Sequence, residues 1–546
     1  MEEIRCNVLV IGGGAAGSRA AYEAKRLNSK LDVVLAVAGK YGSSGSTDLV
    51  ASEALGINAP FNFEGDGDTP DIYYKDTVST GGGLANPKLC RIIADESTDR
   101  LRELIHLGVK FGCKNGKPIQ NKLSGCTKAR SLTCGGSTGR EIVRAFKKAN
   151  HELGVRVVEN TRIIELIKDK NGKVCGAIAL KENRKVVFLA EAIVLATGGT
   201  GAIFSKNINP PALVGDGWAM AYQAGAKLTN MEFYQIGPAV VKPRIQFIIH
   251  SHMWRFAPKL TNALGEEFLP RYCPGGIDPL EVIEAKAMSY PFSVRTIAKY
   301  LDIAIFKEIM DDRGTENGGI YFDVRHAGAE KLEKLAPITY RTLKNAGVDL
   351  AEEKIELGLV VQNFNGGITI DENGFTSVSG LYAAGEVSGG IHGSDRPGGN
   401  NLIDTQVFGY RAGKAAAHYA LENGNSKIPS SIYEKFSAKM ELGKCERELL
   451  RNSEEIYYKE MTIVRTDQGL CKVLDFIEEN LNENNSLIFR NRLLVGQILA
   501  QAELTRKESR GTHYREDYPE SDSEWEKRIV ISKGTDLLPH VSITDI

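Results

Sequence analysis

A glycine-rich turn between apolar segments near the start of the chain limits the folds that the chain can adopt. Residues 6–17 read CNVLVIGGGAAG, so an apolar strand runs directly into the turn. Residues 18–28 then supply good helix formers, and a second apolar run covers 32–38. This order predicts a strand–helix–strand unit and therefore an α/β fold.

The glycines of the turn have the spacing of a dinucleotide-binding motif. Gly12, Gly14 and Gly17 follow the pattern G-x-G-x-x-G. Gly12 permits a tight turn, Gly14 lets the backbone approach a pyrophosphate, and Gly17 lets the helix pack closely on the strand. The N-terminus of the helix then faces the anion. Because the motif follows a strand and opens a helix, we expect it to bind a dinucleotide.

The second strand lacks the acidic residue that usually binds the ribose. That residue is expected about 20 positions after the glycines. Val37 occupies the position, and Asp32 lies at the opposite end of the strand. Either other groups hold the ribose, which we favour, or the nucleotide site has weakened.

The 546 residues are enough for roughly two to four domains of ordinary size. Residues 233–355 show more aromatic residues, prolines and mixed patterns, which predicts an inserted domain. The insertion would interrupt a nucleotide-binding domain formed by 1–232 and 356–422. Helical patterns and charge dominate 423–546, where we expect a C-terminal helical domain with an exposed, turn-rich end at 506–522.

The charge balance gives no indication of a nucleic-acid or membrane partner. The net charge is −1, from 68 basic and 69 acidic residues, so nothing favours nucleic acid or an anionic membrane. No run approaches the ~20 apolar residues of a membrane span. The first residues lack the basic start and long apolar core of a secretory signal. We therefore expect a cytoplasmic protein, with any membrane association supplied by partner subunits.

The nine cysteines are scattered, and none forms a C-x-x-C pair. Zinc and iron–sulfur sites usually bring thiolates together at short spacing. The cysteines therefore predict reduced structural thiols and no metal site. If the protein exchanges electrons with iron–sulfur clusters, those clusters lie on another chain.

A series of motifs gives most of the chain a family resemblance. In order they are IGGGAAG, SGSTDLVASEALGINA, LATGGTGAIF, GDGWAMAYQAGA, NMEFYQIGP, NGGITIDENGFTSVSGLYAAGEV, HGSDRPGGNNLIDTQVFGYRAG and RKESRGTHYREDYPESD. Through them the chain resembles the flavoprotein subunits of succinate dehydrogenase and fumarate reductase, together with L-aspartate oxidase. So many motifs in order are specific for the family and less specific for the reaction.

The resemblance implies a fold and a cofactor. The fold is α/β, with a Rossmann-like FAD-binding domain, an inserted α+β capping domain and a C-terminal helical domain. The isoalloxazine ring of FAD would lie between the FAD-binding domain and the cap, and hydride would pass between flavin N5 and a substrate carbon. The residues that the resemblance places at FAD are Gly12, Gly13, Gly14, Ala15, Ala16, Gly17, Ser44, Ser46, Thr47, Thr197, Gly198, Asp216, Glu386, Asn401 and Leu402.

The stretch GGIHGSDRPGGNN, residues 389–401, matches the family's substrate site. Arg396 occupies the position of the arginine that clamps a carboxylate, and His392 also matches. Arginine suits this role because it makes charge-assisted bidentate contacts. The surrounding glycines leave room for a ligand, which argues against the alternative that Arg396 forms a surface ion pair.

The opposite side of the substrate site departs from the family. The family writes Gln-Phe-His-Pro-Thr where this chain has QIGPA, so Gly237 fills one histidine position. Gln362 fills the other, in the stretch that the family writes His-Tyr-x-Met-Gly-Gly. Two hydrogen-bond donors to the substrate are therefore altered or absent.

The loop that supplies the family's proton-donating arginine is also altered. Here it reads HSHMWRFAPKLTNALGEEF, with Trp254 in the arginine position and Arg255 beside it. His250 and His252 are close in sequence, and histidine shuttles protons near neutral pH. We expect either His252 or Arg255 to face the flavin.

Two further comparisons with the family narrow the chemistry. In L-aspartate oxidase a glutamate and a histidine stand where this chain has Leu123 and Cys126, which disfavours an aspartate substrate. Cys126 is either a reactive thiol near the flavin or, as we favour, a buried inert one. Respiratory members bind FAD covalently through a histidine, and none lies between residues 40 and 60, so we expect noncovalent FAD.

Three functions remain open at this point. The first is an FAD-dependent reductase or dehydrogenase acting on a small carboxylate-bearing substrate. The second is an electron-transfer subunit that works with an iron–sulfur or ferredoxin-like partner on a substrate other than fumarate. The third is a flavin-binding chain without a redox partner.

Overall fold

The computed structural model describes residues 2–49, 55–63, 65–182, 184–423, 439–534 and 539–546. Residues 50–54, which belong to the motif at 44–59, lie outside the described residues. The expected domain boundary between 422 and 423 falls directly before 424–438, which also lie outside them.

The central sheet forms around the predicted strand–helix–strand unit. Its strands follow the order β7-β2-β1-β10-β9-β8, and β17 also pairs with β10. The strands are β1 (Glu2–Ile11), β2 (Val33–Ala36), β7 (Arg156–Val158), β8 (Thr161–Lys168), β9 (Val174–Lys181), β10 (Arg184–Leu195) and β17 (Leu381–Ala383). β7, β2, β1, β10 and β17 are parallel, and β9 and β8 run antiparallel to their neighbours.

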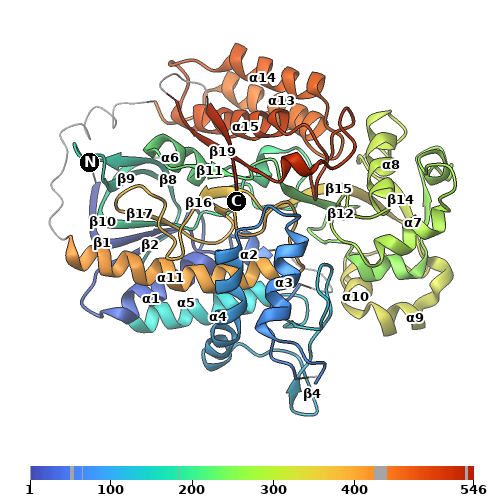
Figure 1. Ribbon diagram of the computed structural model, residues 1–546, viewed down its shortest axis with the longest axis horizontal. Helices are drawn as coiled ribbons and strands as arrows, with labels where there is room; N and C mark the ends of the chain where they lie inside the picture. Colours follow the sequence, from blue (N-terminus) through green and yellow to red (C-terminus); the bar gives the residue numbers. More distant parts are fainter. Residues whose placement is uncertain (1, 50–54, 64, 183, 424–438, 535–538) are drawn as a thin grey trace.

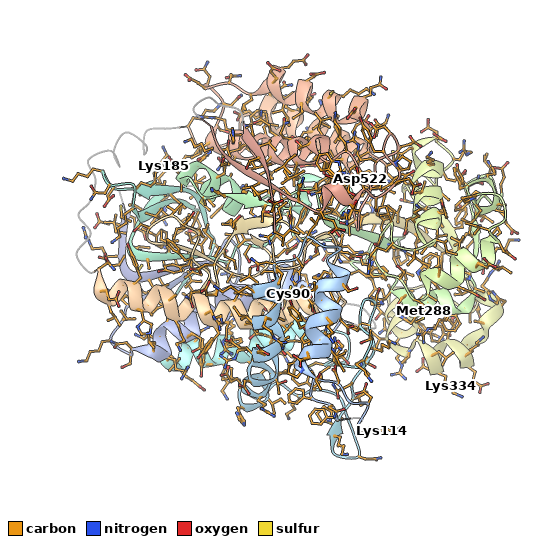
Figure 2. The ribbon with its side chains drawn as sticks, viewed as in Figure 1. Cys90, Lys114, Lys185, Met288, Lys334 and Asp522 are labelled. Carbon is orange, nitrogen blue, oxygen red and sulfur yellow. The ribbon has the colours of Figure 1, made fainter. Side chains whose placement is uncertain are left out.

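Three helices cover one face of this sheet in Figure 1: α1 (Ala15–Leu27), α5 (Thr138–Leu153) and α11 (Asn400–Glu422). Val8–Ile11 of β1, all of β2 and most of β10 are buried on both faces, which explains the nearly continuous apolar sequence of these stretches. Helix α4 (Pro87–His106) packs against α11, and α3 (Pro70–Thr80) packs against α4. Cys90, labelled in Figure 2, is buried in α4, and its Sγ lies 3.2 Å from the Ile391 carbonyl oxygen.

A second, antiparallel sheet leads from the middle of Figure 1 into the mainly helical region at its right. Its order is β12-β15-β14-β13. The strands are β12 (Tyr234–Lys242), β13 (Lys259–Thr261), β14 (Ile320–Asp323) and β15 (Ile355–Phe364). The helices of this region are α7 (Pro279–Lys286), α8 (Lys299–Met310), α9 (Gly328–Leu335) and α10 (Pro337–Asn345). The expected insertion at 233–355 contains all these elements except β15, which starts at its end.

The C-terminal part packs on the opposite side of the central sheet from α11 (Figure 1). Its helices are α13 (Lys444–Met461), α14 (Asp467–Asn480) and α15 (Leu487–Thr505). Two strands that the helical patterns did not predict follow, β19 (Arg528–Lys533) and β20 (Pro539–Thr544). They extend a sheet of order β18-β16-β11-β19-β20, with β11 at Leu228–Thr229, β16 at Gly367–Thr369 and β18 at Ser388–Gly389.

The prediction that 506–522 form an exposed end is wrong for most of 506–515, whereas 519–522 are exposed. Arg506, Glu508 and Arg515 are fully buried. The Nε of Arg506 lies 2.8 Å from a carboxylate oxygen of Glu232, which comes from the loop before β12. Charged side chains can be buried when they are paired, and here the partners come from distant parts of the sequence. The segment ends at Asp522, labelled in Figure 2.

Among the described residues, no helix is both long and apolar enough to cross a membrane. Within the same residues, no three His, Cys, Asp or Glu side chains gather in a way that could hold a metal ion.

Candidate active site

A cavity of about 530 Å³ extends from the carboxyl ends of β1 and β2 to the β12–β15 pair. Its walls come from the N-terminal βαβ unit, the segments 44–49 and 208–216, the second sheet, and the chain at 396–405. Ligands of open α/β sheets bind outside the carboxyl ends of the strands, so the cavity lies where the sequence predicts a dinucleotide.

The glycine turn forms a cradle that side chains would fill. Gly12 has φ +111°, and a Cβ there would lie 2.2 Å from the Ala196 carbonyl oxygen. A Cβ on Gly17 would lie 1.8 Å from the Gly12 carbonyl oxygen, so this glycine allows the close contact between helix and turn. At Gly14 the nearest atom would be the Thr47 hydroxyl, 3.3 Å away. The first turn of α1 contains no acidic residue, so the cradle fits a pyrophosphate at a helix N-terminus.

Nearly all residues expected at FAD line this cavity. The lining residues are Gly12, Gly13, Gly14, Ala15, Ala16, Ser44, Ser46, Thr47, Thr197, Gly198, Asp216, Glu386, Asn401 and Leu402. Gly17 lies behind the wall. The hydroxyl of Thr197 is buried against Gly217 of the following helix and has no hydrogen-bond partner within the described part of the chain.

The end of the cavity near Val37 carries a paired carboxylate. Val37 lines the cavity, and so do Asp216, at the start of α6 (Asp216–Ala224), and Arg162. Arg162 donates two hydrogen bonds to Asp216, at 2.7 and 2.9 Å. Asp32 pairs with Arg156 instead, at 2.8 Å. Polar groups other than an acidic residue at 37 are therefore present here, which supports the interpretation that other groups hold the ribose.

Arg396 lines the other end of the cavity. Its Nη2 donates to the Gln235 side-chain oxygen at 2.5 Å, and its Nη1 donates to the Pro397 carbonyl at 3.1 Å. The Nε is buried and has no partner among the described residues. Burial lowers the pKa of Arg396, although Asp395 and Glu386 oppose this effect. In the described part of the chain no carboxylate lies within ion-pair distance of this guanidinium, so it can accept a carboxylate ligand.

Three further side chains line the cavity, Tyr290, Gln362 and His250, which we call the Tyr290 wall. Gln362 comes from β15 where it pairs with β12, the strand that supplies Gln235. Gln362 Nε2 donates a hydrogen bond to the Tyr290 hydroxyl. The rings of His250 and Tyr290 lie 4.5 Å apart between centroids. A Cβ on Gly237 would lie 2.8 Å from the Tyr290 hydroxyl and 2.9 Å from Gln362 Nε2. These two side chains therefore fill the space beside Gly237, where the family resemblance expects a histidine.

The Tyr290 wall is electrically neutral near pH 7. Desolvation, followed by the charges of His252 and Lys286, lowers the pKa of His250 to about 3, so this imidazole stays neutral. Burial raises the pKa of Tyr290 far above its ordinary value. Lys286 lies behind the wall, with its Nζ 5.7 Å from the centre of the Tyr290 ring, and pairs with Asp302 at 2.6 Å.

The structure does not bring Arg255 or His252 to the cavity, and His250 lines it instead. These residues belong to or precede a short 3₁₀ helix, η2 (Ser251–Phe256). Its turn leaves Arg255 exposed and directs His252 toward α10, where its Nε2 lies 3.2 Å from the Thr339 hydroxyl. Trp254 is buried against Phe322.

His392 also lies outside the lining. It is buried, and its Nε2 is 3.5 Å from a carboxylate oxygen of Asp404 in α11. Burial lowers the pKa of His392 and outweighs the opposing effect of Asp404. The adjacent Gly393 packs tightly on the loop between α3 and α4, because a Cβ there would lie 2.5 Å from the Ala85 nitrogen. This packing holds His392 behind the wall that Arg396 lines.

Cys126 is buried and does not line the cavity. Desolvation raises the pKa of its thiol to about 11, so the thiolate that would react is scarce near neutral pH. This agrees with the favoured interpretation of an inert cysteine. Leu123, in the position of the aspartate oxidase glutamate, does line the cavity.

Comparison with known proteins supports this picture. Residues 7–402 match the family described as "FAD binding domain", and residues 478–544 match the family "Fumarate reductase flavoprotein C-term". One subunit of the fumarate reductase (CoM/CoB) of Methanothermobacter marburgensis is 33% identical, over 97% of this chain and 98% of its own length. An L-aspartate oxidase of Streptomyces coelicolor is 28% identical, over 99% of this chain and 94% of its own length.

A solved structure, that of Mycobacterium smegmatis Sdh1 in complex with UQ1, superposes with a TM-score of 0.84. The two sequences are 30% identical, and the match covers all of this chain and 95% of the Sdh1 chain. This match over the full length confirms the predicted arrangement of a Rossmann-like FAD-binding domain, an inserted cap and a C-terminal helical domain.

Proposed function

Because the chain belongs to the family of FAD-dependent oxidoreductases that includes the fumarate reductase and succinate dehydrogenase flavoproteins, we propose that it transfers hydride between N5 of bound FAD and a small carboxylate-bearing substrate. The observation that carries this proposal is Arg396, whose guanidinium lines the cavity without a carboxylate partner in the described residues. A buried guanidinium that forms no ion pair within the described residues favours an anionic ligand.

The residues around the cavity divide into two roles. The glycine cradle and the N-terminus of α1 would hold the pyrophosphate of FAD, and Thr197, Glu386 and Asn401 offer further polar contacts. At the other end, Arg396 binds the substrate carboxylate, and Gln235 orients the guanidinium through the 2.5 Å hydrogen bond. The buried surroundings exclude water and so strengthen this charge-assisted contact.

Replacing Arg396 tests the proposal. We expect Arg396→Lys to lower turnover at least about 100-fold, because lysine cannot reproduce a bidentate contact held in place by Gln235. FAD content, measured from the flavin absorption of the purified protein, should stay at the wild-type level. Arg325→Lys, on an exposed turn of the cap, is the matched control. Turnover that is unchanged across a panel of unsaturated acids would defeat the proposal.

We propose that FAD is bound noncovalently, since no histidine lies between residues 40 and 60. After acid precipitation the yellow colour should remain in the supernatant. A yellow pellet, with a flavin-labelled peptide after proteolysis, would show a covalent bond and contradict the proposal.

A second candidate is an electron-transfer subunit with an iron–sulfur partner, acting on a substrate other than fumarate. It is favoured by Gly237 and Gln362, which replace two histidines of the family's substrate site. Iron that co-purifies with the native protein in proportion to flavin, and electrons that pass from the flavin to it, would support this candidate. L-aspartate oxidation is disfavoured because Leu123 and Cys126 replace the residues expected for that substrate.

A further inference from the structure

The substrate end of the cavity has one cationic side and one neutral side. Two arginines line the cavity in the described part of the chain. Arg162 is already paired with Asp216, at the end near Val37. Arg396 therefore remains as the cation for a substrate carboxylate. The Tyr290 wall, which lines the same cavity, offers a phenol, an amide and a neutral imidazole.

Within the described residues, the charged side chains behind the Tyr290 wall form ion pairs and leave no further cation for a substrate. Lys286 and Asp302 are both buried and form an ion pair at 2.6 Å. Asp395, beside Arg396, is paired with Arg295 at 2.9 Å. A second carboxylate of a substrate would thus be buried against a neutral wall without a cation to pair with, which is costly.

The wall can instead satisfy a neutral polar group. Gln362 Nε2 donates to the Tyr290 oxygen, which leaves the phenolic hydrogen free to donate. The carbonyl oxygen of the same glutamine remains able to accept. One donor and one acceptor side by side match a primary amide, which accepts through its oxygen and donates through its nitrogen. A carboxylate only accepts and would leave the glutamine oxygen facing negative charge.

The glycine at 237 leaves the space that this arrangement needs. Side chains at this position would collide with the Tyr290 hydroxyl and Gln362 Nε2, at 2.8 and 2.9 Å from the Cβ. Tyr290 is further fixed by ring packing on His250. The wall is therefore a preorganised set of neutral donors and acceptors.

We propose that the substrate carries a single carboxylate, bound by Arg396, and at its other end a neutral amide-like group that the Tyr290 wall recognises. This inference rests on the proposed function, and it replaces a dicarboxylate by a monocarboxylate monoamide as the preferred class. Tyr290 and Gln362 are then the residues that determine specificity.

Binding to the oxidised holoenzyme tests the inference without turnover. Fumarate and its monoamide, fumaramate, have the same shape, and neither can take electrons from a flavin that is already oxidised. Titration of each compound, followed by the perturbation of the flavin absorption spectrum, gives two dissociation constants. We expect fumaramate to bind at least about 10-fold more tightly than fumarate, since an unpaired buried charge costs more than this factor.

Variants assign the preference to the wall. Tyr290→Phe removes the donor and should reduce the preference for fumaramate to less than about 3-fold, and Gln362→Leu should do the same by removing the acceptor. Tyr321→Phe, in β14 and outside the cavity, is the matched control and should keep the wild-type preference. Flavin content and the unliganded flavin spectrum report whether each variant is folded. Because two variants test the wall independently, the test remains possible if one of them fails to fold.

The outcomes separate this inference from the proposed function. Tighter or equal binding of fumarate, with both ligands lost in Arg396→Lys, would overturn the inference and leave the proposed function intact. A preference for fumaramate that survives both wall variants would also overturn it. Absence of Arg396-dependent binding for either acid would defeat the proposed function and this inference together.

Discussion

Glu386 shows how a single residue couples the cavity to pH. It lies at the cavity wall, and its carboxylate accepts a hydrogen bond from the Phe364 nitrogen at 3.0 Å. Desolvation outweighs this bond and the attraction of Arg396, and raises the pKa of Glu386 to about 7. The folded protein therefore binds a proton at this residue between about pH 4.5 and 7, where the unfolded chain has released it. Protonation of Glu386 favours the folded state below this window, and the benefit disappears as the pH rises through 7.

We expect the neutral variant Glu386→Gln to remove this pH dependence. The free energy of unfolding of wild-type apoprotein, relative to the variant, should fall by between about 1 and 3 kcal/mol from pH 4.5 to 8. Thermal or urea unfolding at several pH values measures the difference. Glu352→Gln, on an exposed turn, should follow the wild type. If wild type gained stability over Glu386→Gln as the pH rose, the sign of the pKa shift would be wrong.

Among the elements, the packing of the βαβ unit depends on a close contact between Gly17 and the backbone of Gly12. The Cβ that Gly17 lacks would lie 1.8 Å from the Gly12 carbonyl oxygen, so any side chain must push α1 away from the end of β1. The same displacement would move the first turn of α1, which lines the cradle. A substitution of Gly17 should therefore lower both the stability of the protein and its affinity for FAD.

We expect Gly17→Ala to destabilise the protein by about 2–3 kcal/mol and to leave most of the purified protein without FAD. The flavin-to-protein absorbance ratio and the unfolding midpoint measure the two effects. Gly275→Ala is the control, because a Cβ there would meet nothing within 4 Å and its φ is not positive. Full flavin content in Gly17→Ala would contradict the assigned role of this contact.

Sequence patterns predicted this unit well, because strand, turn and helix signals agree locally. The cavity wall was harder to predict. His250 and His252 are two residues apart, and only the 3₁₀ turn that follows decides which of them lines the cavity. Tyr290 belongs to no motif, and it reaches the cavity because Gly237, more than 50 positions away, leaves the space for it. The absence of a histidine at 237 was the available signal that another side chain fills the site.

Residues 506–515, most of which are buried, were mispredicted for a related reason. Its many charges are typical of an exposed loop, and charge alone does not reveal partners distant in sequence. Glu232 precedes β12 by two residues, yet it neutralises Arg506. Long-range pairing of this kind depends on the finished fold.

At the scale of the whole molecule, the buried residues 510–512 connect three regions around the substrate end of the cavity. The Val294 nitrogen, in the cap, donates to the Gly511 carbonyl at 2.8 Å. The Thr512 nitrogen donates to the Ser394 carbonyl at 3.0 Å, two residues before Arg396. Arg510 Nη1 donates to the Gly82 carbonyl, between α3 and α4, at 2.9 Å. The C-terminal part thus fixes the position of the Arg396 loop relative to the cap.

We therefore expect Gly511→Ala to lower turnover about 10-fold to 100-fold with a smaller loss of FAD. Its Cβ would lie 2.3 Å from the Ser394 carbonyl oxygen and would shift the loop that positions Arg396. Gly265→Ala is the matched control, since Gly265 also has a positive φ (+82° against +53°) but open space around it. Steady-state kinetics and flavin content measure the two effects. Equal losses in both variants would assign the effect to backbone strain alone.

The tight fit at Gly237 also constrains how such a site can change over time. A histidine at 237 would need the volume that Tyr290 and Gln362 already occupy. This substitution alone would therefore displace both side chains of the wall. Shrinking Tyr290 first would instead leave an intermediate with neither set of donors. Single substitutions between the two kinds of site therefore pass through sequences that function poorly. Simultaneous replacement of the contacting residues avoids these intermediates. A lineage that acquired this wall would tend to keep it.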